Sequence, residues 1–334
     1  MKISTTLMGL FVISAGLPAL LHAQPNPLIQ QFGQTQRELQ FQKPRLLNLS
    51  TNMEAPELYP GENADVGPQR ILRLKPRKTY FEVIADSQCM YSDNVYLSED
   101  KKVGGALFIN TIQAALAPEA YAWGPGQFAP MLGFRSQWFN YAENVNLSSL
   151  DFNAQTAFIN GRYQAGNWQF YAACDLTRLL DQPGYNEIYR ECMPTLGFQR
   201  FFPVNDKLMF IVSPQVDYHF TDSQTNNTAG SAVNNRFDAS LNLSLSYLIT
   251  PKLIAQPFYR FQYSRYPDFS DGALPANSRD DLVNTFGGSL AYFFNKYLAV
   301  RVFTVYEINH SSYASAFSYH KFDAGGGLSL DLRF

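Results

Sequence analysis

Two residues near the end of the chain have the types and the spacing that nucleophilic catalysis needs. His310 and Ser312 are separated by one residue, so in an extended strand both side chains point to the same side. A histidine can take the proton of a serine hydroxyl, but it does so efficiently only where a third polar group orients the imidazole. Asn309 directly precedes His310, so in a strand its side chain points to the opposite side (it has the opposite parity) and cannot orient the imidazole. We therefore interpret the pair as the polar base of a loop.

The sequence holds no other motif of established chemistry. It contains no G-x-S-x-G nucleophile turn, H-E-x-x-H zinc motif, phosphate-binding P-loop or C-x-x-C pair. The glycines at 325–327 lie in an alternating segment, which favours close strand packing over a phosphate cradle. We predict a protein that is not an enzyme and that uses no cofactor and no metal ion.

The cysteines are an odd set of three in a chain that its N-terminus marks for export. Cys174 and Cys192 lie at equal distances from Pro183, on two segments that we expect to pair as strands, while Cys89 lies far from both. A cross-strand disulfide between Cys174 and Cys192 and a pair of free thiols facing lipid both fit this pattern.

Charged residues of both signs recur on the polar side of segments that alternate between apolar and polar residues. Such residues could form a constriction that selects small polar solutes, or they could pair across the interior and fill it. The candidates that would line the lumen are Arg135, Asp175, Asp217, Asp238, Arg260, Arg301, Glu307 and Asp323. Both alternatives stay open on the sequence, and we favour the channel.

The alternation itself predicts the fold class. In Phe237–Ile249 every odd position is apolar, and every even position except Leu248 is polar. This run is longer than the roughly five or six residues of an ordinary strand, and it separates two environments. Segments of this kind cover Thr79–Tyr91, Leu107–Ala117, Phe128–Tyr141, Leu150–Ala165, Asn167–Thr177, Ile188–Phe201, Lys207–Thr221, Arg236–Ile249, Lys252–Tyr266, Leu282–Asn295, Tyr297–Ser311 and Lys321–Phe334.

The connections between these twelve segments alternate in length. Tight links follow the fourth, sixth, eighth and tenth segments, whereas long polar loops follow the odd ones, as in outer-membrane barrels with short periplasmic turns and long external loops. One link, Pro118–Gln127, is longer than its class should be. Pro194, Pro214 and Pro257 fall inside segments and each removes a ladder hydrogen bond, so we expect bulges or register breaks there.

The facing of one segment can be predicted residue by residue. In Phe237–Ile249 the odd positions should meet lipid, so arginine at Leu243 should cost about 2–4 kcal/mol and arginine at Asn242 little. Tyr247 and Tyr259 flank the short turn at 250–252, where an interfacial aromatic belt is expected.

The end of the chain resembles the terminal assembly signal of bacterial outer-membrane β-barrels of the porin-like families. Leu330, Leu332 and Phe334 alternate with polar residues in the last segment, and Tyr91–Leu97 is similar to a stretch after the first strand of some porins. Over Thr79–Phe334 the resemblance is one of architecture. It implies an all-β, transmembrane antiparallel up-and-down barrel of about 12 strands, surrounded by outer-membrane lipid and inserted by the barrel-assembly machinery. It does not identify a solute; the preference for small polar solutes rests on the inward charges.

A second resemblance concerns the histidine and serine named first. Outer-membrane phospholipases, which also have twelve strands, carry a His-x-Ser at the external membrane boundary and an asparagine on the next strand. Here the outward positions of the next segment begin with His320, Phe322 and Ala324. This departure from the pattern makes phospholipase activity an unfavoured alternative. A structural or adhesive barrel that acts through its external loops is the second alternative to a channel.

The N-terminus and the composition predict the cellular compartment and exclude one class of partner. Met1–Ala23 has one charge, Lys2, before the apolar run Leu7–Leu21 and is typical of a cleaved signal peptide, which predicts export to the bacterial outer membrane. Residues 24–78 are polar and basic at their end, and we expect a poorly ordered periplasmic extension before the barrel at 79–334. Charged residues make up 16%, the net charge is -2 and the pI is about 6.1, so nothing favours nucleic acid.

Overall fold

The computed structural model describes residues 80–142, 150–182, 184–223, 235–269, 277–313 and 317–334. The predicted signal peptide, 1–23, and extension, 24–78, lie outside these residues. Among the described residues, no helix is long and apolar enough to span a membrane. The strands are β1 Phe81–Ser92, β2 Gly105–Leu116, β3 Tyr121–Trp123, β4 Gly126–Tyr141, β5 Phe152–Ala165, β6 Trp168–Asp181, β7 Glu187–Asn205, β8 Leu208–Ser223, β9 Arg236–Thr250, β10 Leu253–Phe269, β11 Asn277–Phe293, β12 Leu298–Ser311 and β13 Tyr319–Arg333.

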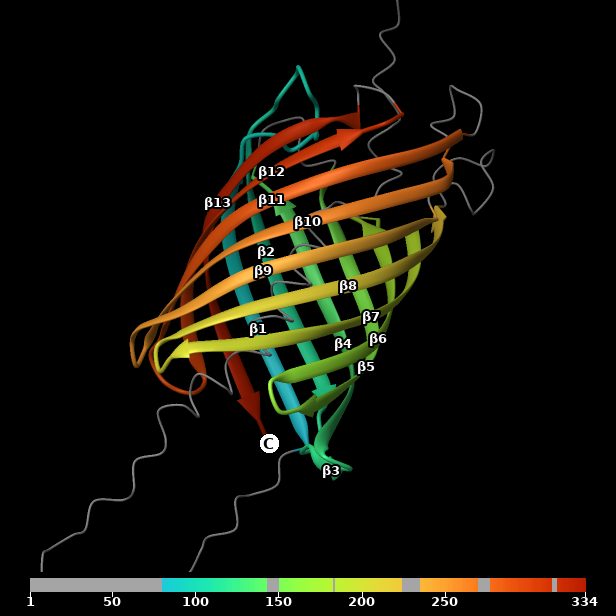
Figure 1. Cartoon of the computed structure of the whole chain (residues 1–334). Coiled ribbons are helices and arrows are strands. Elements are labelled where there is room, and N and C mark those ends of the chain that lie inside the picture. The colour runs from blue at the N-terminus through green and yellow to red at the C-terminus, as the bar shows by residue number, and fades with distance from the viewer. Residues whose placement is uncertain (1–79, 143–149, 183, 224–234, 270–276, 314–316) are drawn as a thin grey trace, which may run out of the picture.

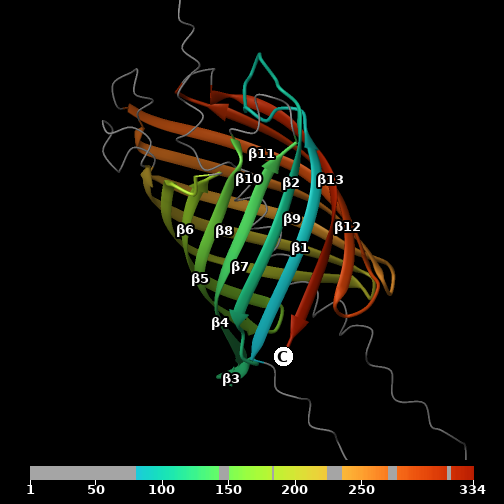
Figure 2. The same cartoon turned by 180° about the vertical axis from the view of Figure 1, so that it is seen from behind.

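Twelve of these strands close into one antiparallel barrel. From β4 to β13 each strand pairs with the next in sequence, β2 pairs with β1 and β4, and β1 pairs with β13. β1 begins and β13 ends at the same end of the barrel (Figures 1 and 2). We call this end, which also carries the short turns, the periplasmic end, and the opposite end the external end. The predicted all-β barrel is confirmed.

The one link that was too long for a periplasmic turn has a structure of its own. β3 pairs with the first residues of β4, Gly126–Phe128, in a hairpin that projects from the periplasmic end (Figure 1). Gly124 turns this hairpin at φ +56°, a conformation that favours glycine. The rings of Tyr121 and Trp123 lie edge-on to Phe128, with centroids 5.5 and 5.4 Å away. The extra length therefore forms an aromatic hairpin at the rim.

The bulges expected at the three prolines are absent, and that prediction is wrong. Pro194 pairs with Cys174, Pro214 with Leu241 and Pro257 with Gly288, and the register is the same on both sides of each proline. On the other edge of each strand the pairing is interrupted for two residues, for example between Ala255 and Phe258 against β9. Each proline therefore leaves a gap in one ladder without an inserted residue.

The alternation in β9 separates the two faces of the barrel as predicted. Asn242, Ser244 and Ser246 point inward and are buried, whereas Leu241 and Tyr247 are exposed on the outside. The exception Leu248 also has a reason, because it packs against an inward apolar cluster near the periplasmic end. That cluster contains Phe201, Met209, Ile211 and Ile254, with Phe293 beside it.

The belt predicted around the turn at 250–252 is only half correct. Tyr247 lies close to this turn, because it pairs with Ala255 on β10 and with Leu208 at the start of β8. Tyr259 pairs with Leu243, so it lies at mid-span, where its hydroxyl donates a 2.8 Å hydrogen bond to Asn284 Oδ1. A polar hydroxyl in lipid is thus satisfied within the wall rather than at the interface.

Glycines on β13 allow the first and last strands to close. A Cβ added to Gly325 would lie 2.5 Å from the carbonyl oxygen of Cys89 and 2.6 Å from Cβ of Met90. A Cβ on Gly327 would lie 2.6 Å from Cγ of Gln88. All three distances are shorter than real Cβ contacts, so the interpretation of residues 325–327 as close strand packing is confirmed.

A charged network at the external end of the lumen

The eight charged residues predicted to line the lumen all have inward parity. Seven of them are buried, and Arg260 alone is half-buried. The structure brings Asp238, Glu307 and Asp323 into one extended network near the external end. Arg135 and Asp175 form a separate ion pair at 3.7 Å. Asp217 accepts hydrogen bonds from Thr195 at 2.6 Å and from Gln215 at 2.7 Å.

The remaining two predicted arginines lie apart from that network. Arg260 donates to the side-chain oxygen of Gln262 on its own strand. Arg301 on β12 is attracted electrostatically to Asp86 on β1, and its guanidinium lies 5.7 Å from the ring centre of Phe303. These two positive charges line the wall of β10 and β12 toward the middle of the barrel.

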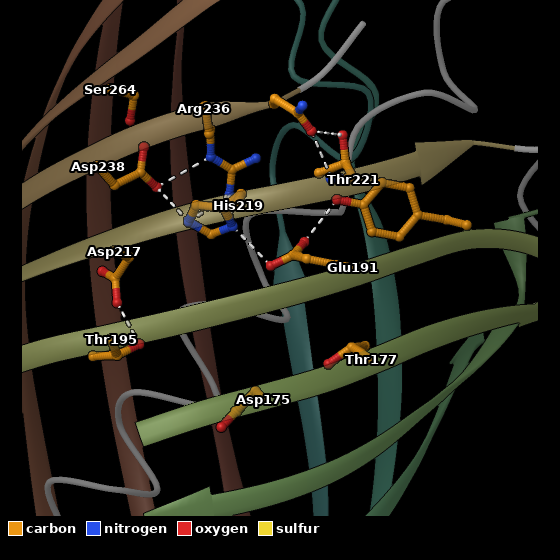
Figure 3. A network of polar contacts seen from close by, with 12 residues as sticks. Asp175, Thr177, Glu191, Thr195, Asp217, His219, Thr221, Arg236, Asp238 and Ser264 are labelled. Atoms are coloured by element: carbon orange, nitrogen blue, oxygen red, sulfur yellow. Dashed lines mark hydrogen bonds and ion pairs between the residues drawn. The ribbon is translucent and has the colours of Figure 1, made fainter. Parts of the chain in front are cut away.

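The network is centred on His219, which β8 holds between carboxylates from β7 and β9 (Figure 3). Nδ1 of His219 lies 2.7 Å from Oε1 of Glu191, and Nε2 lies 3.0 Å from Oδ2 of Asp238. A carboxylate only accepts hydrogen bonds, so both ring nitrogens must carry hydrogens. His219 is therefore a buried imidazolium that bridges two acids.

Arg236 supplies the second positive charge of this centre. Its Nε donates to Oδ2 of Asp238 at 3.1 Å, and its Nη2 lies 3.2 Å from His219. Two cations in contact repel each other, and the two carboxylates offset this repulsion. The hydroxyl of Tyr189 donates to Oε2 of Glu191 at 2.6 Å. Two acids and two bases thus form a neutral, buried group.

A second group continues the network around the wall on β11, β12 and β13. Arg279 donates to Asp281 at 2.9 Å. Lys321 lies 3.2 Å from Asp323 and 3.8 Å from Glu307, which also accepts a 2.8 Å hydrogen bond from Tyr319. The ring of Tyr266 joins the two groups, because Arg236 and Arg279 lie 5.7 and 4.8 Å from its centre. The network therefore spans β7 to β13.

Sequence reasoning missed six charged members of this network, Glu191, His219, Arg236, Arg279, Asp281 and Lys321, although the parity rule could have found most of them. His219 and Glu191 have the same inward parity as the predicted residues on their strands. Arg236 and Lys321 stand at or near the first residue of a strand. Arg279 was assigned to a loop, since the predicted strand began at Leu282 whereas β11 begins at Asn277.

The opposite wall of the lumen is apolar at the same end. Nine buried residues from β1 to β7 pack together there: Met90, Leu107, Ile109, Phe139, Tyr141, Phe152, Ala154, Leu179 and Tyr189. Val95 and Tyr96, from the loop after β1, pack against this cluster. Asn94 in the same loop is fully buried and donates to the carbonyl oxygens of Ser98 and His320. The external end is therefore narrow, with a polar and an apolar wall.

Inward residues outside the network differ in exposure, and on β9 Asn242, Ser244 and Ser246 are buried. Ser240, Ser289 and Ser329 point into the lumen, and each is half-buried rather than buried, like Arg260. Their small side chains occupy little of the cross-section. The inner wall therefore has a few partly exposed polar positions beside the buried ones.

The histidine and serine with a catalytic spacing lie on the outside of the barrel, as their parity predicts. Ser312 Oγ accepts a 2.9 Å hydrogen bond from the backbone N–H of Asp280. His310 is exposed, and among the described residues no side chain orients it. Nothing in this arrangement activates the hydroxyl.

The cysteines face outward and are not bonded. Sγ of Cys174 lies 3.8 Å from Sγ of Cys192, and Cys89 is exposed on another part of the barrel. Of the two alternatives that the sequence left open, the structure has the free thiols. The described ranges contain no group of three or more side chains suited to hold a metal ion.

Comparison with known proteins concerns the fold. No family model matches this chain, and no curated protein matches its sequence. An outer-membrane channel from Pseudomonas putida F1 has a TM-score of 0.50 and 11% identity, over 83% of this chain and 100% of that one. KdgM porin, solved with disordered oligogalacturonate, has a TM-score of 0.40 and 12% identity, over 74% of this chain and 98% of that one. The β domain of the Bordetella autotransporter Brka has a TM-score of 0.42 and 11% identity, over 74% of this chain and 98% of that one.

These identities are too low to carry a shared activity, and the channel at 0.50 alone supports the comparison of folds. Closure of the sheet, the tilt of its strands and the apolar outer face point the same way. The chain has the fold of a bacterial outer-membrane β-barrel.

Proposed function

We propose that the protein is a narrow porin-like channel that lets small polar solutes cross the outer membrane, with its constriction at the charged network. The observation that carries this proposal is the polar lining of the lumen, where charged and hydrogen-bonding side chains of β7 to β13 face inward. A barrel whose interior served only as a core could be filled by apolar side chains alone, without the cost of removing charged groups from water. The fold shared with an outer-membrane channel is consistent with this role.

The charges at the constriction would select solutes by polarity more than by sign. Acids and bases alternate around the wall from Glu191 to Asp323, and most neutralise one another in pairs. A solute with hydrogen-bonding groups can exchange contacts with such a wall, whereas an apolar solute cannot. The eight predicted lumen residues act in this proposal as parts of that selective lining.

Planar-bilayer recordings of the purified barrel test the proposal. We expect small, discrete conductance steps. Arg260→Ser removes a half-buried positive charge from the lumen and should shift the reversal potential in a salt gradient toward cation preference. Arg265→Ser on the outer face of the same strand is the matched control and should leave it unchanged. A barrel that inserts, by vesicle flotation, without any conductance would contradict the channel.

One observation favours a second function, a structural or adhesive barrel that acts through its external loops. The network and the apolar cluster together bury nearly every inward side chain at the external end. If these groups never separate, the lumen stays blocked and the loops carry the function. The same recordings distinguish the two functions, since only the channel conducts.

We further propose that the protein is not an enzyme and that the barrel-assembly machinery recognises Phe334. The backbone of Phe334 already closes the seam, accepting a hydrogen bond from Tyr80 N–H at 2.7 Å and donating one to Phe81 at 2.9 Å. Phe334→Ala keeps these bonds, so barrels refolded in detergent should be as stable as before. In cells the Phe334→Ala variant should yield less folded barrel than wild type. Equal yields of folded barrel would contradict recognition of Phe334.

A further inference from the structure

The outer surface of the barrel carries a groove near its external end. Its volume is about 610 Å³, and residues of β4 to β8 line it together with Asn235. Phe134, Leu176 and Phe220 are exposed on its walls, and Ala157 and Cys192 supply its small residues. The groove does not belong to the lumen, since these five side chains have outward parity.

The strand register arranges the groove in two tiers. Phe134 pairs with Ala157, Ala157 with Leu176, Leu176 with Cys192 and Cys192 with Phe220, so these five residues form one apolar row across five strands. Two small residues between three large ones leave the hollow. A row of this composition suits a hydrocarbon chain lying against the wall.

The next row toward the external end is polar and contains two arginines and one aspartate. Gln155 pairs with Arg178, Arg178 with Arg190, and Arg190 with Asp222. The change from apolar to charged residues within one pairing step places the membrane boundary between the two rows. The groove therefore lies in the outer leaflet, and its polar row lies at the level of the lipid headgroups.

Arg178 and Arg190 lie directly opposite each other on neighbouring strands, and Glu187 and Asp222 beside Arg190 offset only part of their repulsion. Arg178 donates two hydrogen bonds to the neutral oxygen of Gln155, at 2.9 and 2.7 Å. Arg190 contacts Glu187 at 2.7 Å, yet its side chain remains 62% exposed. Guanidinium groups bind phosphate oxygens in a bidentate fork, so this pair is suited to a phosphate group.

We propose that this groove binds an acylated, phosphate-bearing glycolipid of the outer leaflet, of the lipopolysaccharide class. One acyl chain lies along the row from Phe134 to Phe220, and a sugar phosphate contacts Arg178 and Arg190. The size of the groove fits part of one acyl chain, and the arginine pair lies where the phosphorylated sugar of such a lipid begins. This site is independent of conduction through the lumen.

The test measures binding of purified lipid A to the whole barrel in detergent, by native mass spectrometry. We expect wild type to retain lipid A that carries both phosphates, and to retain its dephosphorylated form about tenfold less. The double variant Arg178→Gln, Arg190→Gln should lose the same preference. Arg200→Gln, an exposed outward arginine near the periplasmic end, is the matched control and should behave as wild type.

A second pair of variants tests the apolar row. Ala157→Phe fills the groove and should weaken lipid A binding, whereas Ala172→Phe adds the same ring to the outer face of β6 nearer the periplasmic end and should not. Heat-modifiable gel mobility shows that each variant is folded. Equal binding by wild type and the double arginine variant would overturn the proposal, as would tighter binding of phosphatidylglycerol than of lipid A.

Discussion

His219 separates two carboxylates that would otherwise repel each other inside the barrel. Glu191 and Asp238 come from strands on either side of it, and neither reaches water, so their charges depend on cations within the wall. Asp238 has Arg236 as a second partner at 3.1 Å. For Glu191, the imidazolium is the cation in direct contact.

Replacing His219 with leucine should destabilise the barrel by about 3–5 kcal/mol, because Glu191 would stay buried without the cation that it contacts. Urea unfolding in lipid vesicles, followed by tryptophan fluorescence, measures this change. His310→Leu is the matched control, since His310 is exposed and should change the free energy of unfolding by no more than about 0.5 kcal/mol. Equal stability of the two variants would show that His219 is not a charged bridge.

At the scale of the element, the outer face of β9 should tolerate a charge near the turn better than a charge at mid-span. Leu243→Arg places a charge at mid-span in lipid and should cost about 2–4 kcal/mol, whereas Ile249→Arg, on the same face near the turn, should cost about 0–1 kcal/mol. Equilibrium unfolding of both variants in vesicles tests this difference in depth. If the two costs are the same, the outer face of β9 does not cross the hydrocarbon core.

The inward face of β9 corrects one sequence-based expectation. Arginine at Asn242 was expected to cost little in a polar lumen, but Asn242 is only 8% exposed. The added volume must displace neighbouring side chains, so we expect Asn242→Arg to cost about 1–3 kcal/mol through overpacking. The same unfolding measurement applies, and a cost near zero would show that the lumen is roomier than the packing at this level indicates.

The glycines of β13 provide a third prediction at this scale. Gly325→Val should cost more than about 1 kcal/mol, because its side chain would meet the carbonyl of Cys89 and the side chain of Met90 across the seam. Gly288→Ala on β11 is the control: its Cβ would have no neighbour closer than 3.8 Å, and it should leave stability unchanged or slightly raised. Thermal midpoints from heat-modifiable mobility compare the two.

All twelve strands could be predicted from alternation, but several of their ends could not. β6 continues past Thr177 to Asp181, β7 past Phe201 to Asn205, and β11 begins five residues before Leu282. Alternation requires apolar residues only where a strand faces lipid, and the extensions of β6 and β11 carry charged residues instead. The pattern therefore predicts the embedded part of a strand, and Arg279, which lies in an extension, was missed for this reason.

The partners within the lumen could not be predicted in the same way. Parity shows that Asp238 points inward, but it does not show that His219 on one neighbouring strand and Gln262 on the other reach it. Those contacts depend on the stagger between strands, which is a property of the closed barrel. Side-chain length matters as well, since only a long arginine such as Arg236 reaches the ring of Tyr266.

For the whole molecule, we expect a β-dominated circular dichroism spectrum in detergent and a folded band on gels that shifts on heating. Both follow from a closed barrel without free edges, which resists detergent until it is heated. The test uses the chain without residues 1–23, unheated and boiled. A monomer that stays soluble in plain buffer would contradict the membrane-spanning barrel, because its outer face would then have no lipid to cover it.

The seam between β1 and β13 also governs when the molecule can fold. Glu82 pairs with Arg333, so the first and last strands pair although almost the whole barrel sequence separates them. Such a contact has the greatest loop-closure cost in the chain and favours slow folding. Until β13 has been exported, every earlier strand arrangement has two unpaired edges that can join those of another chain. We therefore expect a chain shortened before β13 to aggregate rather than form a smaller barrel.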